Sequence, residues 1–220
     1  LSYVPKDVMV IFNMHAPGWN SMETIDNIEN ADKLAKVLAP YVCHVFAGHT
    51  HFFENVEVTP RLYQHNIAAA CGAWWTSNLN RDGAPNGYMV ATVNGTEMTW
   101  QYRPTNSKTM VQMRVYKPGE FRTQKEYVVA NVWEWDPHCR VVWYEDGRYM
   151  GRMQQFINND EAFLLTKPRP HQLAKTQHLF RAKPTSKKYR TIKVIFTNRF
   201  NQSYTYTIVN RNNRPFLLDK

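Results

Sequence analysis

The sequence predicts an α/β unit followed by a small all-β sandwich within a chain of 220 residues. Two short, continuous apolar runs flank a helical segment in the first fifty or so residues, a pattern typical of a strand-helix-strand unit. Short runs rich in Trp, Tyr, Val and Thr, separated by turn signals, fill the second half and favour a β-sandwich. The composition, with 43% hydrophobic and 14% aromatic residues, excludes a disordered or fibrous chain.

The strand-helix-strand unit is expected near the start of the chain. A first buried strand over residues 7–14 leads directly to His15. A helix over residues 31–39 follows, with Asn30 placed to cap it, and a second buried strand covers residues 41–47. Because ligands gather where strands end in open α/β sheets, we expect functional residues just after the two strands.

Strands are expected over most of the remaining sequence. They cover residues 55–59, 62–71, 87–93, 97–103, 110–116, 127–134, 140–145, 148–153, 178–182, 190–198 and 203–210. The strands over residues 87–93 and 97–103 are joined at Asn94-Gly95, which predicts a β-hairpin. Residues 104–109 are polar and rich in structure breakers, which indicates a domain boundary. The predicted domains are therefore residues 1–104 and the β-sandwich at residues 110–220.

The formal charge of +9 is concentrated at one end of the sequence. Residues 167–220 hold 13 Lys and Arg against 1 Asp and Glu. Charged and apolar residues alternate over residues 189–196, so we favour a solvated strand face or interdomain docking over a polyanion site. Nucleic acid is not an expected partner. No apolar run approaches the roughly 18 residues of a membrane helix, so no transmembrane segment is predicted.

Three histidines follow the two buried strands. His15 ends the first strand, and Gly48-His49-Thr50-His51 ends the second. Three imidazoles at one sheet edge suit a first-row divalent metal, and Gly48 is expected to let the backbone turn and approach closely. The alternative is a hydrogen-bonded pair of loop histidines without a metal.

On these residues the sequence resembles the calcineurin-like metallophosphoesterases, in the bacterial group that carries a C-terminal β domain. The resemblance extends through Gly72-Ala73-Trp74-Trp75, residues 82–88, and Trp-rich segments around Trp133 and Trp143. It implies that residues 1–104 are the C-terminal half of a metallophosphoesterase αββα sandwich. It also implies a periplasmic or cell-envelope location, because members of this type are often exported.

The resemblance implies a reaction as well as a fold. Two divalent ions, Mn, Fe, Zn or Mg, would activate water for attack on a phosphate mono- or diester. His15 and His49 would bind one ion, and His51 the other. Small-molecule, lipid or glycan phosphoesters are the implied substrates.

The early motifs of that family, Asp-x-His, Gly-Asp-x-x-Asp and Gly-Asn-His, do not occur in residues 1–104. Three neutral histidines without a bridging carboxylate give neither the ligand number nor the negative charge that two dications need. We therefore expect the N-terminal half of the catalytic domain to be a missing partner. No complete set of catalytic residues is expected in this chain, which is predicted to be inactive alone.

Four further residues are candidate substrate contacts. Trp74, Trp75, Asp82 and Tyr88 follow a strand near the expected mouth of the site, where aromatic rings can pack against flat organic groups and sugars. The alternative is that one Trp of the pair packs in the core. A second hypothesis for the whole chain is a non-catalytic binding module, in which the basic β domain recognises an anionic glycan, envelope component or nucleic acid.

Overall fold

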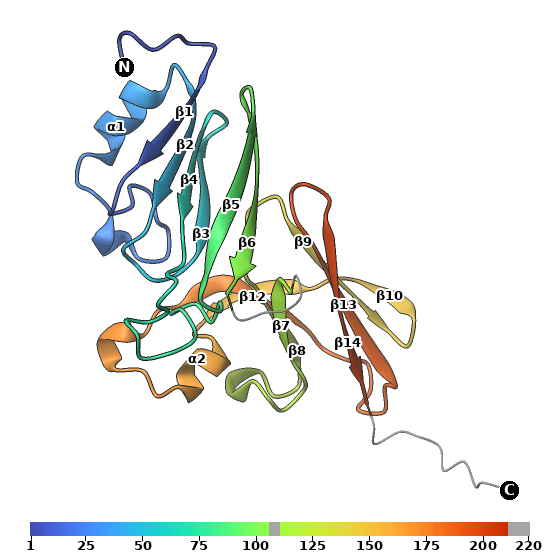
Figure 1. Ribbon diagram of the computed structural model, residues 1–220. Coiled ribbons are helices and arrows are strands. Elements are labelled where there is room, and N and C mark those ends of the chain that lie inside the picture. The colour runs from blue at the N-terminus through green and yellow to red at the C-terminus, as the bar shows by residue number, and fades with distance from the viewer. Residues whose placement is uncertain (106–110, 211–220) are drawn as a thin grey trace, which may run out of the picture.

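The computed structural model of the protein describes residues 1–105 and 111–210 (Figure 1). Strands make up 42% of these residues and helices 11%. The strands form three four-stranded sheets and one two-stranded sheet. The α/β class predicted for the first part of the chain, half of an αββα sandwich, is therefore wrong, because the described residues have an all-β character.

The first sheet has the strand order β1-β2-β4-β3. Strands β1 (Met9–Asn13), β2 (Val42–Ala47) and β4 (Leu62–Asn66) are parallel, and β3 (Glu54–Thr59) runs antiparallel to β4. The connection between β1 and β2 contains the helix α1 (Ala31–Leu38), whereas the chain passes from β2 to β4 through β3. A single helix of eight residues cannot supply the helical layers that an αββα sandwich requires.

A β-hairpin takes the place of those layers on one side of the first sheet. Strands β5 (Gly87–Asn94) and β6 (Glu97–Pro104) pair around Gly95, as the sequence predicts. Met98 and Trp100 of β6 form a buried cluster with Tyr63 of β4. The hairpin lies beside the sheet in Figure 1, so strands cover a face for which helices were expected.

The helix α1 covers the other hydrophobic cluster of the first sheet. Leu38 is fully buried with Tyr41, and Leu34 packs against the same cluster. Asn30 precedes the helix as predicted but makes no side-chain capping hydrogen bond. The predicted cap is therefore wrong, and the helix depends on packing of its apolar face.

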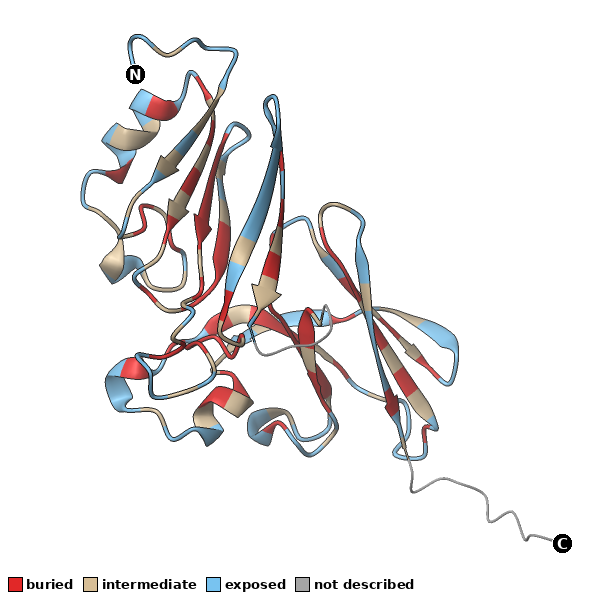
Figure 2. Ribbon diagram, in the orientation of Figure 1, coloured by how far each residue is buried: buried red, intermediate tan, exposed pale blue. Residues whose placement is uncertain are grey.

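The second half consists of two antiparallel sheets, with the orders β11-β12-β8-β7 and β10-β9-β13-β14. Their strands are β7 (Met113–Tyr116), β8 (Val128–Val132), β9 (Arg140–Glu145), β10 (Arg148–Arg152), β11 (Gln154–Asn158), β12 (Thr176–Ala182), β13 (Thr191–Thr197) and β14 (Ser203–Val209). One hydrophobic core joins the two sheets and includes Trp135 and Trp143, and Figure 2 shows buried residues along their strands.

Four short helices complete the described elements. They are η1 (Thr24–Asp26), η2 (Arg122–Gln124), α2 (Glu161–Leu165) and η3 (Pro170–Gln172). None of the helices in the described ranges has the length and hydropathy needed to cross a bilayer.

The two halves share one buried cluster. Phe53, Ala68, Ala84 and Tyr102 pack with Trp133, which follows β8. Residues 106–109, most of the predicted boundary segment at residues 104–109, lie outside the described residues. The division into two domains stays a prediction.

Candidate functional site

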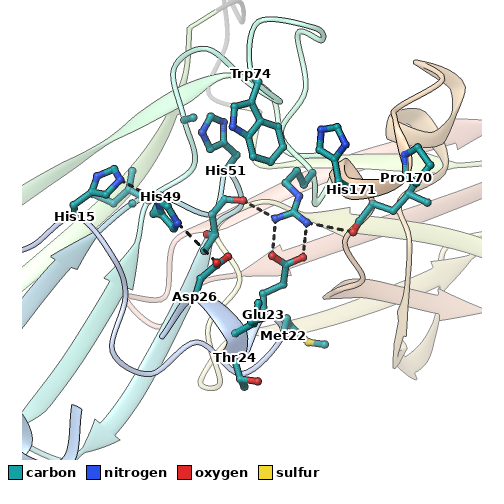
Figure 3. A pocket seen from close by; sticks show the side chains of 17 residues that line it. His15, Met22, Glu23, Thr24, Asp26, His49, His51, Trp74, Pro170 and His171 are labelled. Carbon is teal, nitrogen blue, oxygen red and sulfur yellow. Dashed lines mark hydrogen bonds and ion pairs between the residues drawn. The ribbon is translucent and has the colours of Figure 1, made fainter. Parts of the chain in front are cut away.

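A cleft of about 900 Å³ opens beside the carboxyl ends of β1 and β2 (Figure 3). His15 comes from the segment after β1, and His49 and His51 come from the loop after β2. Because β1 and β2 are parallel neighbours, both segments leave the same edge of the sheet. The cleft is also lined by Glu23, Asp26, Thr50, Trp74, Arg81 and His171.

His15 and His49 are direct neighbours in the lining of the cleft. The Nδ1 atom of His49 lies 2.9 Å from Nε2 of His15, and the rings meet edge to face. Nitrogen ligands bind first-row divalent ions at about 2.0–2.1 Å, so two that share one ion at a right angle lie about 3 Å apart. The same 2.9 Å is the length of a hydrogen bond between the two imidazoles, in which one nitrogen carries the proton. The spacing therefore fits both a hydrogen-bonded histidine pair and two ligand positions of a single divalent ion.

The second nitrogen of His49 also has a partner. Its Nε2 atom lies 3.8 Å from a carboxylate oxygen of Asp26 (Figure 3). This distance is longer than a hydrogen bond, so Asp26 places a negative charge near His49 without bonding to it directly. Asp26 thus belongs to the site as a group that acts on His49.

His51 is held apart from this pair. Its Nδ1 atom donates a hydrogen bond to the Gly72 carbonyl at 2.5 Å, and its ring stacks on Trp74 with centroids 4.4 Å apart. Since a carbonyl only accepts, Nδ1 carries the proton of this hydrogen bond, and Nε2 is the nitrogen left for another partner. Within residues 1–105 and 111–210, no group of three or more His, Cys, Asp or Glu side chains is arranged to hold a metal ion. The described side chains therefore supply at most two neighbouring nitrogen ligands, and they do not complete a two-metal centre.

The backbone around these side chains is strained. His49, His51, Trp74 and Trp75 all adopt left-handed backbone angles, with φ of 71°, 55°, 49° and 64°. Non-glycine residues in that region cost on the order of 1–3 kcal/mol each, and such strain concentrates at functional sites. Gly48, in contrast, does not have a left-handed φ, and an added Cβ would meet no atom within 4 Å. The turn therefore does not depend on Gly48, contrary to the sequence-based expectation.

Arg81 joins the segments that build the cleft. Its buried guanidinium pairs with both carboxylate oxygens of Glu23 and donates to the Thr50 carbonyl at 3.1 Å. It also donates to the Gln172 carbonyl at 3.0 Å and to the Leu173 carbonyl at 3.2 Å. One side chain thus connects the histidine loop to the connection between α2 and β12. Arg81 was not predicted because no local pattern in the sequence marks it.

That connection brings a fourth histidine into the cleft. His171, in η3, meets the edge of Trp74 with ring centroids 6.2 Å apart. Trp74 lines the cleft and is 41% exposed. Trp75 and Tyr88 are exposed at 86% and 53%, and neither lines this cleft. His171 was not predicted because only the tertiary fold brings it to the site.

Asp82 is buried beneath the cleft region and does not line the cleft. Its carboxylate accepts from the backbone N–H of Phe53 at 2.6 Å and of Ala84 at 2.9 Å. Burial raises the pKa of Asp82 to about 7, and the nearby Asp160 carboxylate adds to this effect. Burial lowers the pKa of His178, 3.7 Å away, to about 3, so this imidazole is neutral at pH 7 and the contact is not an ion pair.

These pKa shifts predict how stability depends on pH. The raised pKa of Asp82 gives stability that is fully present below pH 3.8 and is lost as pH rises through about 7. His178 acts in the opposite direction, since its contribution to stability is lost as pH falls from 6.5 towards about 3.

The substitution Asp82→Asn removes only the effect of Asp82. Relative to the natural chain, its unfolding free energy should rise by about 3 kcal/mol between pH 4 and 7, because each pKa unit is worth about 1.4 kcal/mol and each of these two pH values lies close to one of the two pKa values. Urea titrations across this range measure the difference, and a pH-independent difference would contradict the assignment.

One Asp-x-His sequence occurs outside residues 1–104, at Asp136-Pro137-His138. Asp136 accepts from the Tyr63 hydroxyl at 2.8 Å and pairs with Arg199 at 3.2 Å. His138 lines a different cleft, where it pairs with Glu57. This sequence therefore does not replace the missing early motif at the histidine cleft.

Comparison with known families gives one match. Residues 64–204 match the family described as the C terminal of calcineurin-like phosphoesterase. No curated protein matches the sequence. The matched range includes Trp74, Arg81 and His171, whereas His15 and the histidine loop precede it.

Proposed function

Because the chain belongs to the calcineurin-like phosphoesterase family through this C-terminal region, we propose that it is part of a metal-dependent hydrolase of phosphate mono- or diesters. The observation that carries the proposal is the 2.9 Å approach of His15 Nε2 and His49 Nδ1 at the ends of two parallel strands. A divalent ion bound there would attract the phosphate and lower the pKa of a bound water.

The residues of this chain would provide one side of that site. His15 and His49 would hold one ion, and the Asp26 carboxylate would place a negative charge beside them. The Nε2 atom of His51 is left for another partner, but a second ion would need further ligands, including carboxylates, from outside this sequence. A periplasmic or envelope location is part of the proposal and rests on the family resemblance alone.

Aromatic rings would form one wall of the substrate site. Trp74 is flanked by His51 on its face and His171 at its edge, and the Arg81 guanidinium lies 5.5 Å from its ring centroid. A partly exposed indole in a cleft packs against a sugar ring or a flat leaving group. The β-sandwich half therefore takes part in substrate recognition, through His171 and the backbone carbonyls that fix Arg81.

Because this chain lacks the further metal ligands that a two-metal centre needs, we expect the isolated chain to be inactive. With Mn²⁺ added, the 220-residue chain should not hydrolyse 4-nitrophenyl phosphate or bis(4-nitrophenyl) phosphate faster than these substrates hydrolyse in buffer without protein. Turnover that disappears in His49→Ala would contradict the predicted inactivity of the chain alone.

The reading frame upstream of Leu1 tests the proposed function itself. We expect it to encode Asp-x-His, Gly-Asp-x-x-Asp and Gly-Asn-His, and the longer protein should hydrolyse one of the two substrates in a His49-dependent manner. An upstream frame without these motifs would contradict the proposal and leave the binding-module hypothesis.

A further inference from the structure

A second cleft lies on the β-sandwich, apart from the histidine cleft. The β7–β8 and β12–β13 loops meet around a cleft of about 650 Å³. Lys117 and Lys125 line it from the first loop, and Lys183 and Lys187 from the second. All four are exposed. Glu126 is the one carboxylate among the described residues of the lining, and it pairs with Lys183 at 2.7 Å.

Strand alternation does not account for this gathering of positive charge. The four lysines lie in two loops that are distant in the sequence, and the fold brings them to one cleft. Lys193, which does lie on a strand, places its ammonium 4.4 Å from the Tyr144 ring centroid instead. The hydrogen bond from Lys183, together with the charges of Lys183 and Lys187, lowers the pKa of Glu126. A cleft lined by charges of one sign concentrates the field and attracts ions of the opposite sign.

The cleft continues into a longer groove. A neighbouring cleft of about 590 Å³ shares Lys117, Tyr189 and Asn210 with it and extends along β14. Tyr206, 40% exposed, lines this extension and offers an aromatic surface. Two connected clefts are longer than a single anion requires, and they suit an extended chain that carries repeated charges.

We propose that this groove binds an anionic polysaccharide, with carboxylate or sulfate groups of the sugar chain at the lysines and a sugar ring against Tyr206. Lysine is a compact point charge with three donors, which can pair with the oxygens of carboxylate and sulfate groups without a fixed geometry. Grooves for single-stranded nucleic acid use several stacking aromatics, often with arginine. Among the described residues of this groove, Tyr206 is the one exposed aromatic, and no arginine lines it. The lining therefore favours a glycan over nucleic acid.

The test uses the whole chain and two matched charge variants. Lys125→Glu with Lys187→Glu reverses two charges of the groove, whereas Lys33→Glu with Lys36→Glu makes the same change in net charge on the exposed face of α1. The helix α1 lies at the opposite end of the molecule from the β12–β13 loop (Figure 1). Circular dichroism confirms that both variants fold.

Calorimetry at two salt concentrations would measure binding of heparin, polygalacturonate, neutral dextran and single-stranded oligo(dT). We expect binding of heparin, polygalacturonate or both, weaker binding at higher salt, and no binding of dextran. The groove variant should lose on the order of tenfold in affinity, since reversing charges removes attraction and adds repulsion, and the α1 variant should lose little.

Binding of heparin alone would indicate that the groove binds sulfate groups, and binding of polygalacturonate alone would indicate that it binds carboxylates. Absence of glycan binding, tighter binding of oligo(dT), or equal losses in both variants would each overturn the proposal. The histidine cleft contributes no residue to this groove, so the result does not depend on the phosphoesterase proposal.

Discussion

His49→Ala should weaken the binding of Mn²⁺ or Zn²⁺ to the isolated chain on the order of 100-fold or more. Substitutions that only disturb the orientation of a metal ligand cost 10–100-fold in affinity, and removal of one of two facing ligands should cost at least as much. His15 Nε2 and His49 Nδ1 are the two nitrogens within reach of a shared ion, so either substitution leaves a single imidazole. Isothermal titration calorimetry of the natural chain and the variant measures the loss.

His51→Ala is the matched control for that experiment. His51 follows His49 by two residues in the same loop, but its Nδ1 donates to the Gly72 carbonyl and its ring stacks on Trp74. Its removal should leave the first binding event almost unchanged. An equal loss of affinity in His49→Ala and His51→Ala would show that the ion lies between these two residues, contrary to the observed pairing.

Gly83→Ala should destabilise the protein by about 4 kcal/mol or more, which is exceptional for a single methyl group. A Cβ at Gly83 would lie 2.1 Å from Cγ of Asp160, and its φ of 81° is left-handed. Asp160 cannot move away, because it is fully buried and accepts hydrogen bonds from Tyr116, Asn131 and the backbone of Phe163. The contact joins the loop before β5 to the N-terminus of α2, so the substitution disturbs a contact between the two halves of the chain. Urea-induced unfolding measures the effect.

Gly147→Ala distinguishes steric conflict from backbone strain. Gly147 has a φ of 84°, close to that of Gly83, but an added Cβ there would meet no atom within 4 Å. Its cost should be about 1–2 kcal/mol, the value for a left-handed L-residue alone. Similar losses in the two variants would show that the contact with Asp160 is unimportant.

The local elements of the fold were predictable because their signals are local. The apolar run of β1, the amphipathic α1 and the Asn94-Gly95 turn each specify structure within about ten residues. The fold class was not predictable in the same way, since it depends on what covers the sheet. Trp100 of the hairpin packs against Tyr63 on one face of the first sheet. Nothing in the sequence of the hairpin indicates that the hairpin takes the place of a helix.

Two elements of the second half were missed for different reasons. The strand β11 is an edge strand whose residues are half-buried or exposed, so it lacks an apolar pattern. The helix α2 has only five residues, yet Asp160 accepts a hydrogen bond from the Phe163 N–H, a capping signal that the sequence does contain.

The candidate site was predictable only where residues follow strands. Parallel β1 and β2 bring His15 and His49 together, as their positions imply. The positions of His51 and Asp82 depend on partners distant in the sequence, Gly72 for one and the Phe53 N–H for the other. Arg81 and His171 reach the cleft through contacts between the halves, which local patterns cannot indicate.

The most direct test is the position of a bound metal ion in the intact chain. Anomalous diffraction from crystals soaked in Zn²⁺ or Mn²⁺ locates the ion without reference to activity. We expect one ion bound by both His15 and His49, with Asp26 near the other nitrogen of His49. We expect no second ion next to the first. Two adjacent ions, or a single ion bound by His51 and not by His15, would contradict this expectation.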